Sequence, residues 1–292
     1  MADDIGALTE AVRAHPGVTA KAQISLVSEI FGTPDWLTGP GDDGAVVMTE
    51  GKALVVGGEA ILPAFVAADP FGAGVAAVTT NLNDLAAMGA WPLALVDTLT
   101  GPRPVMRQVL EGMRWAAGLY DVPVVGGHLT MTSGPPSLSA FGLGRADRPL
   151  SARAAEPGQS LVFAACLDGR MRDDFPFFPS FDERGERLSG DVRLLAEGAA
   201  AGWVAAAKDV SMAGLVGSLA MLLECNRQGC RCVSGSPASL ASRSCSAYRR
   251  PRWANACARS PGAAWPPRSP APSTPPGNCA CAGPARRVSR ST

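Results

Sequence analysis

Residues 81–92, NLNDLAAMGAWP, decide the fold of this chain. They end a segment, residues 71–90, that is rich in alanine and almost free of charge, which is typical of a buried helix ending at Gly89. Asn81 and Asp84 stand three residues apart, so they share one face of that helix. A carboxylate on a buried apolar helix needs a partner, and a metal ion is one. A helix cap or a single buried hydrogen bond is the alternative.

Short apolar segments on both sides of this helix indicate strands. Residues 45–48 and 53–58 predict a hairpin, and the turn residues 49–52 join its strands. Because strands and helices interleave along the chain, the fold class is α/β or α+β. The remaining expected elements are helices at 5–31, 103–119, 191–206 and 211–224, strands at 93–99, 122–125, 137–145 and 161–167, and a loop at 171–190.

Asp42 and Asp43 stand together in a glycine-rich segment just before the first expected strand. Adjacent side chains diverge in a loop or strand, so the pair could serve two ligands. Hard oxygen ligands of this kind suit Mg²⁺, which commonly takes one or two carboxylates together with substrate phosphates. The alternative is a solvated turn.

Two further segments carry polar groups beside glycine or a helix start. Residues 126–130, GGHLT, follow an apolar strand, and paired glycines let backbone N–H groups approach a phosphate. A tight turn is the alternative there, with His128 as an ordinary hydrogen-bonded loop residue. Asp209 and Ser211 precede the last expected helix, which either of them could simply cap.

Residues 225–292 differ abruptly from the rest of the chain. They contain 11 arginines and no acidic residue, whereas residues 1–224 contain all 26 acidic residues of a chain with no net charge. Three interpretations are open: a disordered basic tail, a metal or redox module, and an out-of-frame translation of a GC-rich gene. The loss of every acidic residue at one point favours the frame change. The cysteine spacing contains no C-x2-C pair, which argues against a zinc ribbon.

The composition limits the class of protein. The 292 residues, 47% of them apolar, suffice for one or two domains with a core. The sequence has no run of 18 apolar residues and no basic segment at the start followed by an apolar stretch. We therefore expect a cytoplasmic protein with no membrane segment, and we do not expect a nucleic-acid partner; the small-molecule substrate that we also expect is implied by the resemblance described next.

These segments together resemble the ATP-binding superfamily of aminoimidazole ribonucleotide (AIR) synthase, which includes thiamine-monophosphate kinase, selenophosphate synthetase and the hydrogenase-maturation protein HypE. The resemblance covers about residues 1–228. The matching segments, in the expected order, are PGDDGAVV (40–47), VVGGEAILPAFV (55–66), TTNLNDLAAMGAWPLALVD (79–97), VPVVGGHLT (122–130), AEPGQSLV (155–162) and KDVSMAGLVGSLAMLLE (208–224).

The resemblance implies a PurM-like architecture of two α/β-type halves, of which the first forms a homodimer through its sheet. It implies an ATP-binding domain at 1–150 and an incomplete second domain at 151–228. It does not cover residues 229–292, whose composition predicts a disordered, out-of-frame basic tail. It also implies ATP and Mg²⁺ as cofactors. The residues carried over are Asp42, Asp43, Glu59 and Asp84 for metal, Gly41, Asn81, Gly126, Gly127, His128 and Thr130 for the nucleotide, and Asp209 and Asp43 for catalysis.

Three residues depart from the kinases of this superfamily. Glu59, His128 and Met212 stand where those kinases have aspartate. The sequence is therefore most similar to an uncharacterised branch known only as AIR synthase-related. The expected function is ATP-dependent phosphoryl transfer to an oxygen of a small metabolite, or activation of that oxygen. The alternative is a non-catalytic nucleotide-binding or regulatory protein that has lost catalytic carboxylates.

Overall fold

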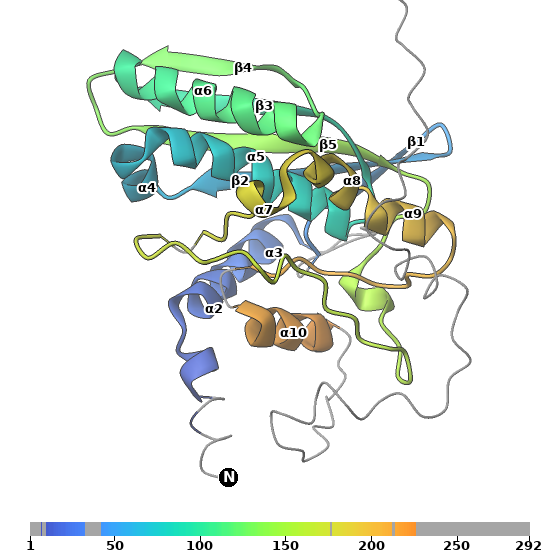
Figure 1. Ribbon diagram of the computed structural model, residues 1–292. Coiled ribbons are helices and arrows are strands. Elements are labelled where there is room, and N and C mark those ends of the chain that lie inside the picture. The colour runs from blue at the N-terminus through green and yellow to red at the C-terminus, as the bar shows by residue number, and fades with distance from the viewer. Residues whose placement is uncertain (1–6, 8–9, 33–41, 176, 212–213, 226–292) are drawn as a thin grey trace, which may run out of the picture. The chain divides into compact units, whose positions relative to one another are not determined.

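The computed structural model describes residues 7, 10–32, 42–175, 177–211 and 214–225 (Figure 1). The chain divides into two units, residues 1–231 and 232–292, and every described residue belongs to the first. Gly41, Met212 and the tail expected at 229–292 lie outside the described residues.

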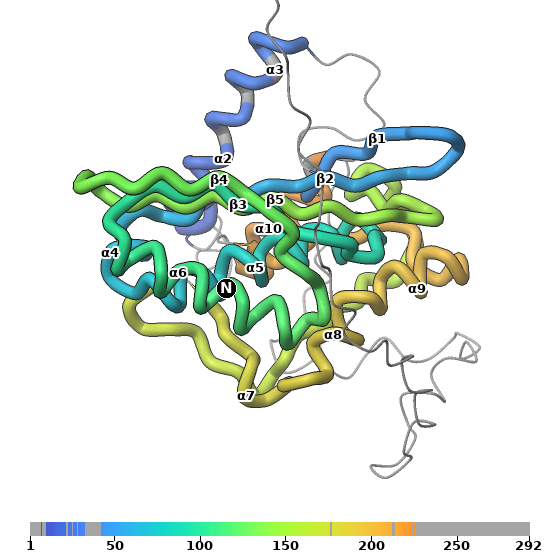
Figure 2. Tube along the Cα trace, turned by 90° about the horizontal axis from the view of Figure 1, so that it is seen from above, coloured from blue at the N-terminus to red at the C-terminus, as the bar shows by residue number. Residues whose placement is uncertain are grey.

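The first unit is built on a five-stranded sheet with the strand order β1-β2-β5-β3-β4. Strands β3 and β4 pair in parallel, and the other neighbours pair antiparallel. The strands are β1 (Ala45–Thr49), β2 (Lys52–Ile61), β3 (Trp91–Gly101), β4 (Val124–Met131) and β5 (Ser137–Ala146). The expected hairpin is confirmed, because β1 turns back into β2 through Glu50 and Gly51, both with positive φ (Figure 2).

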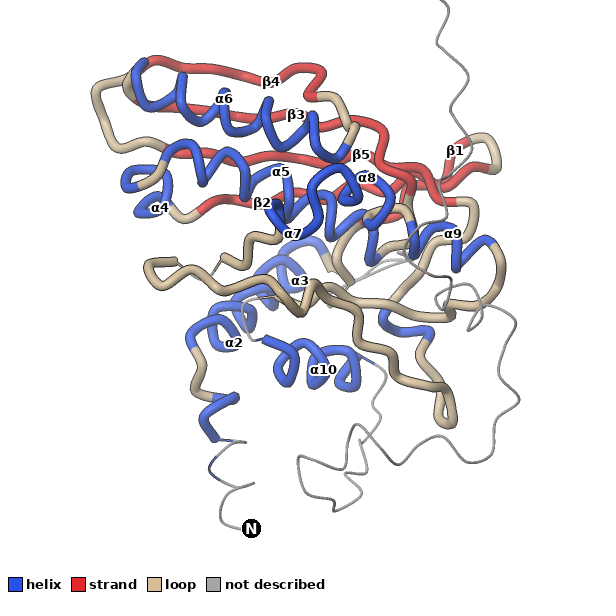
Figure 3. The backbone as a smooth tube through the Cα atoms, in the orientation of Figure 1, coloured by secondary structure: helices blue, strands red, loops and turns tan. Residues whose placement is uncertain are grey.

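Two long helices, α5 (Pro70–Ala87) and α6 (Arg103–Tyr120), pack against each other and cover one face of the sheet (Figure 3). Helix α5 begins at a proline, and the side chain of Asp69 accepts a hydrogen bond from the Gly72 backbone N–H at its first turn. Glycine brings the two helices into backbone contact, since a Cβ at Gly74 would lie 2.1 Å from the Val109 carbonyl oxygen. This layer confirms the α+β class.

The core lies between these helices and the sheet, and it includes Val55, Leu82, Leu85, Leu95 and Leu138. Alternate strand residues point to the opposite face of the sheet. Part of that face is apolar and exposed: its residues Val56, Val96, Phe141 and Leu143 are 36–40% exposed and lie opposite one another in the register of β2, β5 and β3, whereas Thr98 and Ser139 lie beside them on the same face. A free apolar face of this kind is typical of an interaction surface.

Shorter elements complete the described part of the chain. They are α2 (Pro16–Lys21), η1 (Ala22–Ile24), α3 (Ser25–Phe31), α4 (Pro63–Ala68), η2 (Ala152–Ala154), α7 (Phe181–Arg184), η3 (Gly185–Arg187), α8 (Leu188–Asp191), α9 (Leu194–Ala200) and α10 (Gly214–Cys225). The helix expected at 191–206 is therefore shorter than predicted. The loop expected at 171–190 contains helical turns, and its Phe175 stacks on Phe65 of the core with ring centroids 4.6 Å apart.

The strand predicted at residues 161–167 is wrong. The segment has no regular structure, and Leu161, Val162 and Leu167 are 68%, 69% and 83% exposed. A strand is stable only when a neighbour pairs with its backbone N–H and C=O groups and a second layer covers its apolar side chains. The described residues provide neither for this segment.

Candidate functional site

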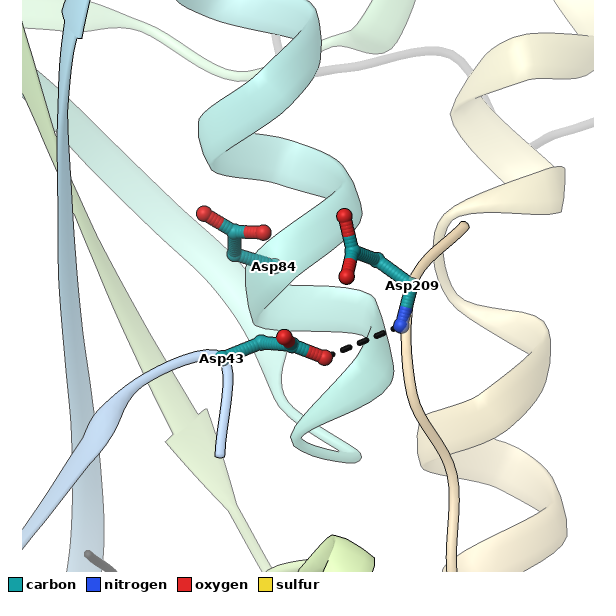
Figure 4. A group of neighbouring side chains, drawn as sticks. All are labelled: Asp43, Asp84 and Asp209. Atoms are coloured by element: carbon teal, nitrogen blue, oxygen red, sulfur yellow. Dashed lines mark hydrogen bonds between the residues drawn. The ribbon is translucent and has the colours of Figure 1, made fainter. Parts of the chain in front are cut away.

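Three aspartates from distant parts of the sequence meet in one place (Figure 4). Asp43 precedes β1, Asp84 lies in the last turn of α5, and Asp209 lies in the segment before α10. One carboxylate oxygen from each lies within 4.8 Å of the others. The Asp209 backbone N–H also donates to Asp43 Oδ2 at 2.9 Å, which fixes the first and last segments together. The structure thus brings together three of the residues that the sequence singled out.

A lysine, Lys208, enters the same cluster. Its Nζ donates a hydrogen bond to Asp43 Oδ1 and another to Asp209 Oδ1, the latter at 3.0 Å. The Lys208 side chain is 5% exposed, and the Asp43 and Asp209 side chains are 8% and 18% exposed. Burial alone lowers the pKa of Lys208, but Asp209 and Asp43 outweigh this effect and raise it, so the ammonium stays charged.

The carboxyl groups of the cluster are held in surroundings that disfavour their charge. Burial, and then the negative charge of Asp209, raises the pKa of Asp84 to about 9. Burial and Asp209 also raise the pKa of Asp43 to about 7, although Lys208 acts in the opposite direction. Glu59 on β2 belongs to the same electrostatic group, because burial and Asp209 raise its pKa while Lys21 and Lys208 lower it. Such a group of carboxyls favours the binding of a further cation.

Asn81 adds an unsatisfied acceptor one helical turn before Asp84. Its side chain is 1% exposed, and its Nδ2 donates to the Ala77 carbonyl oxygen at 2.8 Å. Its Oδ1 is buried and has no hydrogen-bond partner among the described residues. A buried acceptor without a donor is costly, so this atom marks a place where a donor or a cation would be favourable.

Asp42 points away from its neighbour Asp43. Its carboxylate accepts hydrogen bonds from the Ser151 hydroxyl, at 2.9 and 3.0 Å, and from the Ala152 backbone N–H at 2.7 Å. The structure therefore places Asp42 at the start of η2 and not in the cluster with Asp84 and Asp209. The expected divergence of the two side chains is what the structure shows.

The residues expected at a phosphate lie on β4, at the far edge of the sheet from the β1–β2 hairpin. Segment 126–130 is part of a strand and not of a loop or turn. Glu59, Ala140, Asp97 and Gly127 are partners in register across β2, β5, β3 and β4. Three strand spacings, about 14 Å, therefore separate Gly127 from Glu59. The described chain does not bring Gly126, Gly127, His128 and Thr130 to the carboxylate cluster, and their contact with the nucleotide stays a prediction.

Packing against Asp97 explains the glycine at position 127 without any contact to a phosphate. A Cβ there would lie 2.3 Å from Asp97 Oδ1 and 2.6 Å from the Asp97 carbonyl oxygen, whereas a Cβ at Gly126 would meet nothing within 4 Å. Asp97 is 6% exposed, and burial raises its pKa. On the neighbouring positions of β4, Thr130 Oγ1 lies 3.2 Å from His128 Nε2.

Sequence reasoning did not select Lys208 for the site, nor did it single out the buried Asp97. Lys208 is one of only three lysines in the chain and stands next to Asp209, but a charged pair before a helix normally faces solvent. Asp97 is the only charged residue of the largely apolar segment 93–99, and this is the signal in the sequence that its carboxyl group could lie inside.

No helix among the residues that the structure describes is long and apolar enough to cross a membrane.

The comparisons with known proteins agree with the resemblance drawn from the sequence. Residues 41–146 match the family described as "AIR synthase related protein, N-terminal domain". An uncharacterised protein of Synechocystis, sll0787, is 33% identical over 65% of this chain and 60% of its own length. The phosphoribosylformylglycinamidine synthase subunit PurL of Methanosarcina barkeri is 30% identical over 64% of this chain and 30% of its own length. The chain thus spans 60% or less of these two relatives.

Comparison with solved structures agrees with the sequence comparisons. The solved structure of AaThiL complexed with AMPPCP and TMP has a TM-score of 0.56 to this chain at 20% identity, and the match covers 70% of this chain and 69% of AaThiL. The mixed sheet with its helix layer is therefore a PurM-like fold of the kind seen in that protein. Residues 41–146 are thus similar to the N-terminal domain of AIR synthase-related proteins, and the fold of the chain is similar to that of AaThiL.

Proposed function

We propose that this chain binds Mg·ATP at the cluster of Asp43, Asp84 and Asp209 and transfers a phosphoryl group to an oxygen of a small metabolite, or activates that oxygen. The observation that carries the proposal is the convergence of these three carboxylates, from segments up to 166 residues apart, within 4.8 Å. The ATP analogue in the AaThiL structure supports nucleotide binding by this fold.

The donor set suits Mg²⁺. Carboxylate oxygens are its preferred protein ligands, and it usually takes one or two of them together with phosphate oxygens. The last turn of α5 carries a partial negative charge, so Asp84 lies where a cation is favourable and a bare carboxylate is not. The unpaired Asn81 Oδ1 on the same face of α5 is a further acceptor, suited to a metal-bound water or a nucleotide donor. Magnesium would neutralise phosphate charge and align the transferred group.

The chain's own residues have separate roles in this proposal. Asp43 and Asp84 hold the metal, with Glu59 contributing its charge from β2. Asp209 lies on the segment that the sequence resemblance assigns to catalysis, and it faces the same space (Figure 4). Asp42 joins the start of the described segment 42–175 to η2 through Ser151 and Ala152.

We further propose that the chain forms a homodimer through the open face of its sheet. Its apolar residues Val56, Val96, Phe141 and Leu143 are each more than a third exposed, although all are large and apolar. A second copy of this face would cover them and bring residues of β4 in one copy toward the other.

A second candidate function is nucleotide binding without catalysis. The ammonium of Lys208 already pairs with Asp43 and Asp209, so part of the carboxylate charge is balanced within the chain. His128 stands where the kinases of the superfamily have a carboxylate. ATP consumption, measured with a panel of small hydroxyl- and carboxyl-bearing metabolites, separates the two functions. Turnover that depends on one acceptor supports the catalyst, whereas tight Mg·ATP binding with no turnover supports the binding protein.

A further inference from the structure

Lys208 has a position that the proposed function does not explain. Its ammonium lies inside the carboxylate cluster and donates to Asp43 Oδ1 and Asp209 Oδ1. These two carboxylates are also candidates for holding the metal, and the ligand atoms of the cluster lie within 4.8 Å of one another. The ammonium and a divalent ion would therefore compete for the same two oxygens, Asp43 Oδ1 and Asp209 Oδ1.

The ammonium of lysine is a compact point charge with three donors, and it can stand in for a small metal ion among oxygens. Lys208 therefore partly balances charge that would otherwise be available to a divalent ion.

We infer that Lys208 is an internal counter-ion that keeps divalent metal out of the carboxylate cluster until a nucleotide arrives with it. This inference rests on the proposed Mg·ATP site. Lys208 has to leave Asp43 and Asp209 before a divalent ion binds them, and in the absence of nucleotide the ammonium loses both partners. With a nucleotide, the polyphosphate offers the displaced ammonium new negative partners close by. Free metal thus binds weakly, and the metal–nucleotide complex binds well.

The inference concerns the charge of Lys208, and side-chain variants can separate that charge from a purely structural role. The contact between the two segments does not depend on the Lys208 side chain, since the Asp209 backbone N–H donates to Asp43 Oδ2 independently. A K208M variant removes the ammonium, keeps an unbranched side chain and leaves that hydrogen bond in place. K208R retains the charge but replaces the compact ammonium with a larger planar group.

The first test measures Mn²⁺ binding to the full chain by the electron paramagnetic resonance signal of free Mn²⁺. We expect K208M to bind Mn²⁺ alone at least tenfold more tightly than the native chain. K52M, which removes an exposed lysine from the β1–β2 hairpin, should match the native chain. With AMPPCP present, we expect the difference between K208M and the native chain to shrink below threefold.

Two results would contradict the inference, and they differ in what they mean for the proposed function. If K208M melts cooperatively and binds Mn²⁺ no more tightly than the native chain, while Mn·AMPPCP still binds both, the proposed function stands and the counter-ion inference is wrong. If neither protein binds Mn²⁺ with or without AMPPCP, both are wrong.

A second test uses the native chain and so does not depend on how variants fold. The chain has three lysines, so acetylation by a limiting reagent is read at each of them by mass spectrometry. Without metal, Lys208 should react slowly compared with Lys52, because its side chain is 5% exposed and its amine is charged. At saturating Mn²⁺ we expect its rate relative to Lys52 to rise at least threefold. An unchanged ratio would mean that Lys208 does not leave the carboxylates, which overturns the inference.

Discussion

Lys208 donates a hydrogen bond to the carboxylate of Asp43, 165 residues earlier in the chain, and both side chains are more than nine-tenths buried. Two buried charges at this separation in sequence hold the segment before β1 against the segment before α10. Asp84 on α5 completes the group. The candidate site is thus formed by tertiary structure, and it predicts how particular changes affect stability and binding.

The first prediction concerns pH. The raised pKa of Asp84, about 9 against an ordinary 3.8, means that the folded state keeps a proton that the unfolded state has lost between these values. The free energy of unfolding therefore falls as pH rises from about 4 to about 9, by up to about 1.4 kcal/mol per pH unit from this group. Thermal melts in a metal chelator should show this slope, and D84N should flatten it. A melting temperature that rises across this range only in the native chain would contradict the assignment.

The second prediction concerns Asp42. Asp42→Ala removes the acceptor of hydrogen bonds from Ser151 and Ala152, which should cost about 1–3 kcal/mol of stability, measured by urea unfolding. Affinity for Mg·AMPPCP should stay within threefold, because Asp42 lies outside the cluster. A tenfold loss of affinity in a stable variant would instead make Asp42 a metal ligand, as the sequence resemblance implied.

The third prediction concerns the two glycines of β4. Gly127→Ala should destabilise the fold by roughly 1–3 kcal/mol, because the added Cβ would lie 2.3 Å from Asp97 Oδ1. Gly126→Ala is the matched control and should leave stability within about 0.5 kcal/mol, since its Cβ meets nothing within 4 Å. If both variants fold as the native chain does and both lose nucleotide affinity, the predicted phosphate contact is supported and the packing explanation of Gly127 fails.

The fourth prediction concerns the open face of the sheet. F141R places a charge in the middle of the apolar face formed by β2, β5 and β3, so it should convert a dimer into a monomer in light scattering after size exclusion. L194R, an equally drastic change at an exposed leucine of α9, should leave the oligomeric state unchanged. A native chain that is monomeric at micromolar concentration would rule out a stable dimer through this face.

The sequence predicted local elements best where pattern and packing agree. The β1–β2 hairpin follows from two apolar runs around a turn. Helix α5 follows from an alanine-rich segment, almost free of charge, that is followed by Gly89. The segment 161–167 has an equally strong strand pattern, yet it forms none. The apolar pattern of a segment indicates only its own preference for strand structure. A strand also requires a neighbouring strand to pair with, and the described residues provide none for this segment.

The site was predicted in part. Residue chemistry marked Asp43 and Asp84 as possible metal ligands, and the family resemblance added Asp209, but no local pattern shows that three segments so far apart converge. The inward position of Lys208 could not be predicted. The local sequence does not distinguish a buried lysine from an exposed one, because the difference lies only in what the fold places around it. The GGHLT segment was expected to be a turn or phosphate loop, and it is a strand paired with β3.

The most direct test of the central claim is calorimetric titration of the full chain with AMPPCP, with and without Mg²⁺, for the native chain and for D84N. We predict that Mg²⁺ tightens binding to the native chain at least tenfold and that D84N loses this gain. D121N makes the same chemical change at an exposed residue just after α6, and asparagine also adopts the left-handed backbone conformation of Asp121. This control variant should keep the gain in affinity that Mg²⁺ gives. AMPPCP binding that is independent of both Mg²⁺ and Asp84, or no binding at all, would contradict the claim.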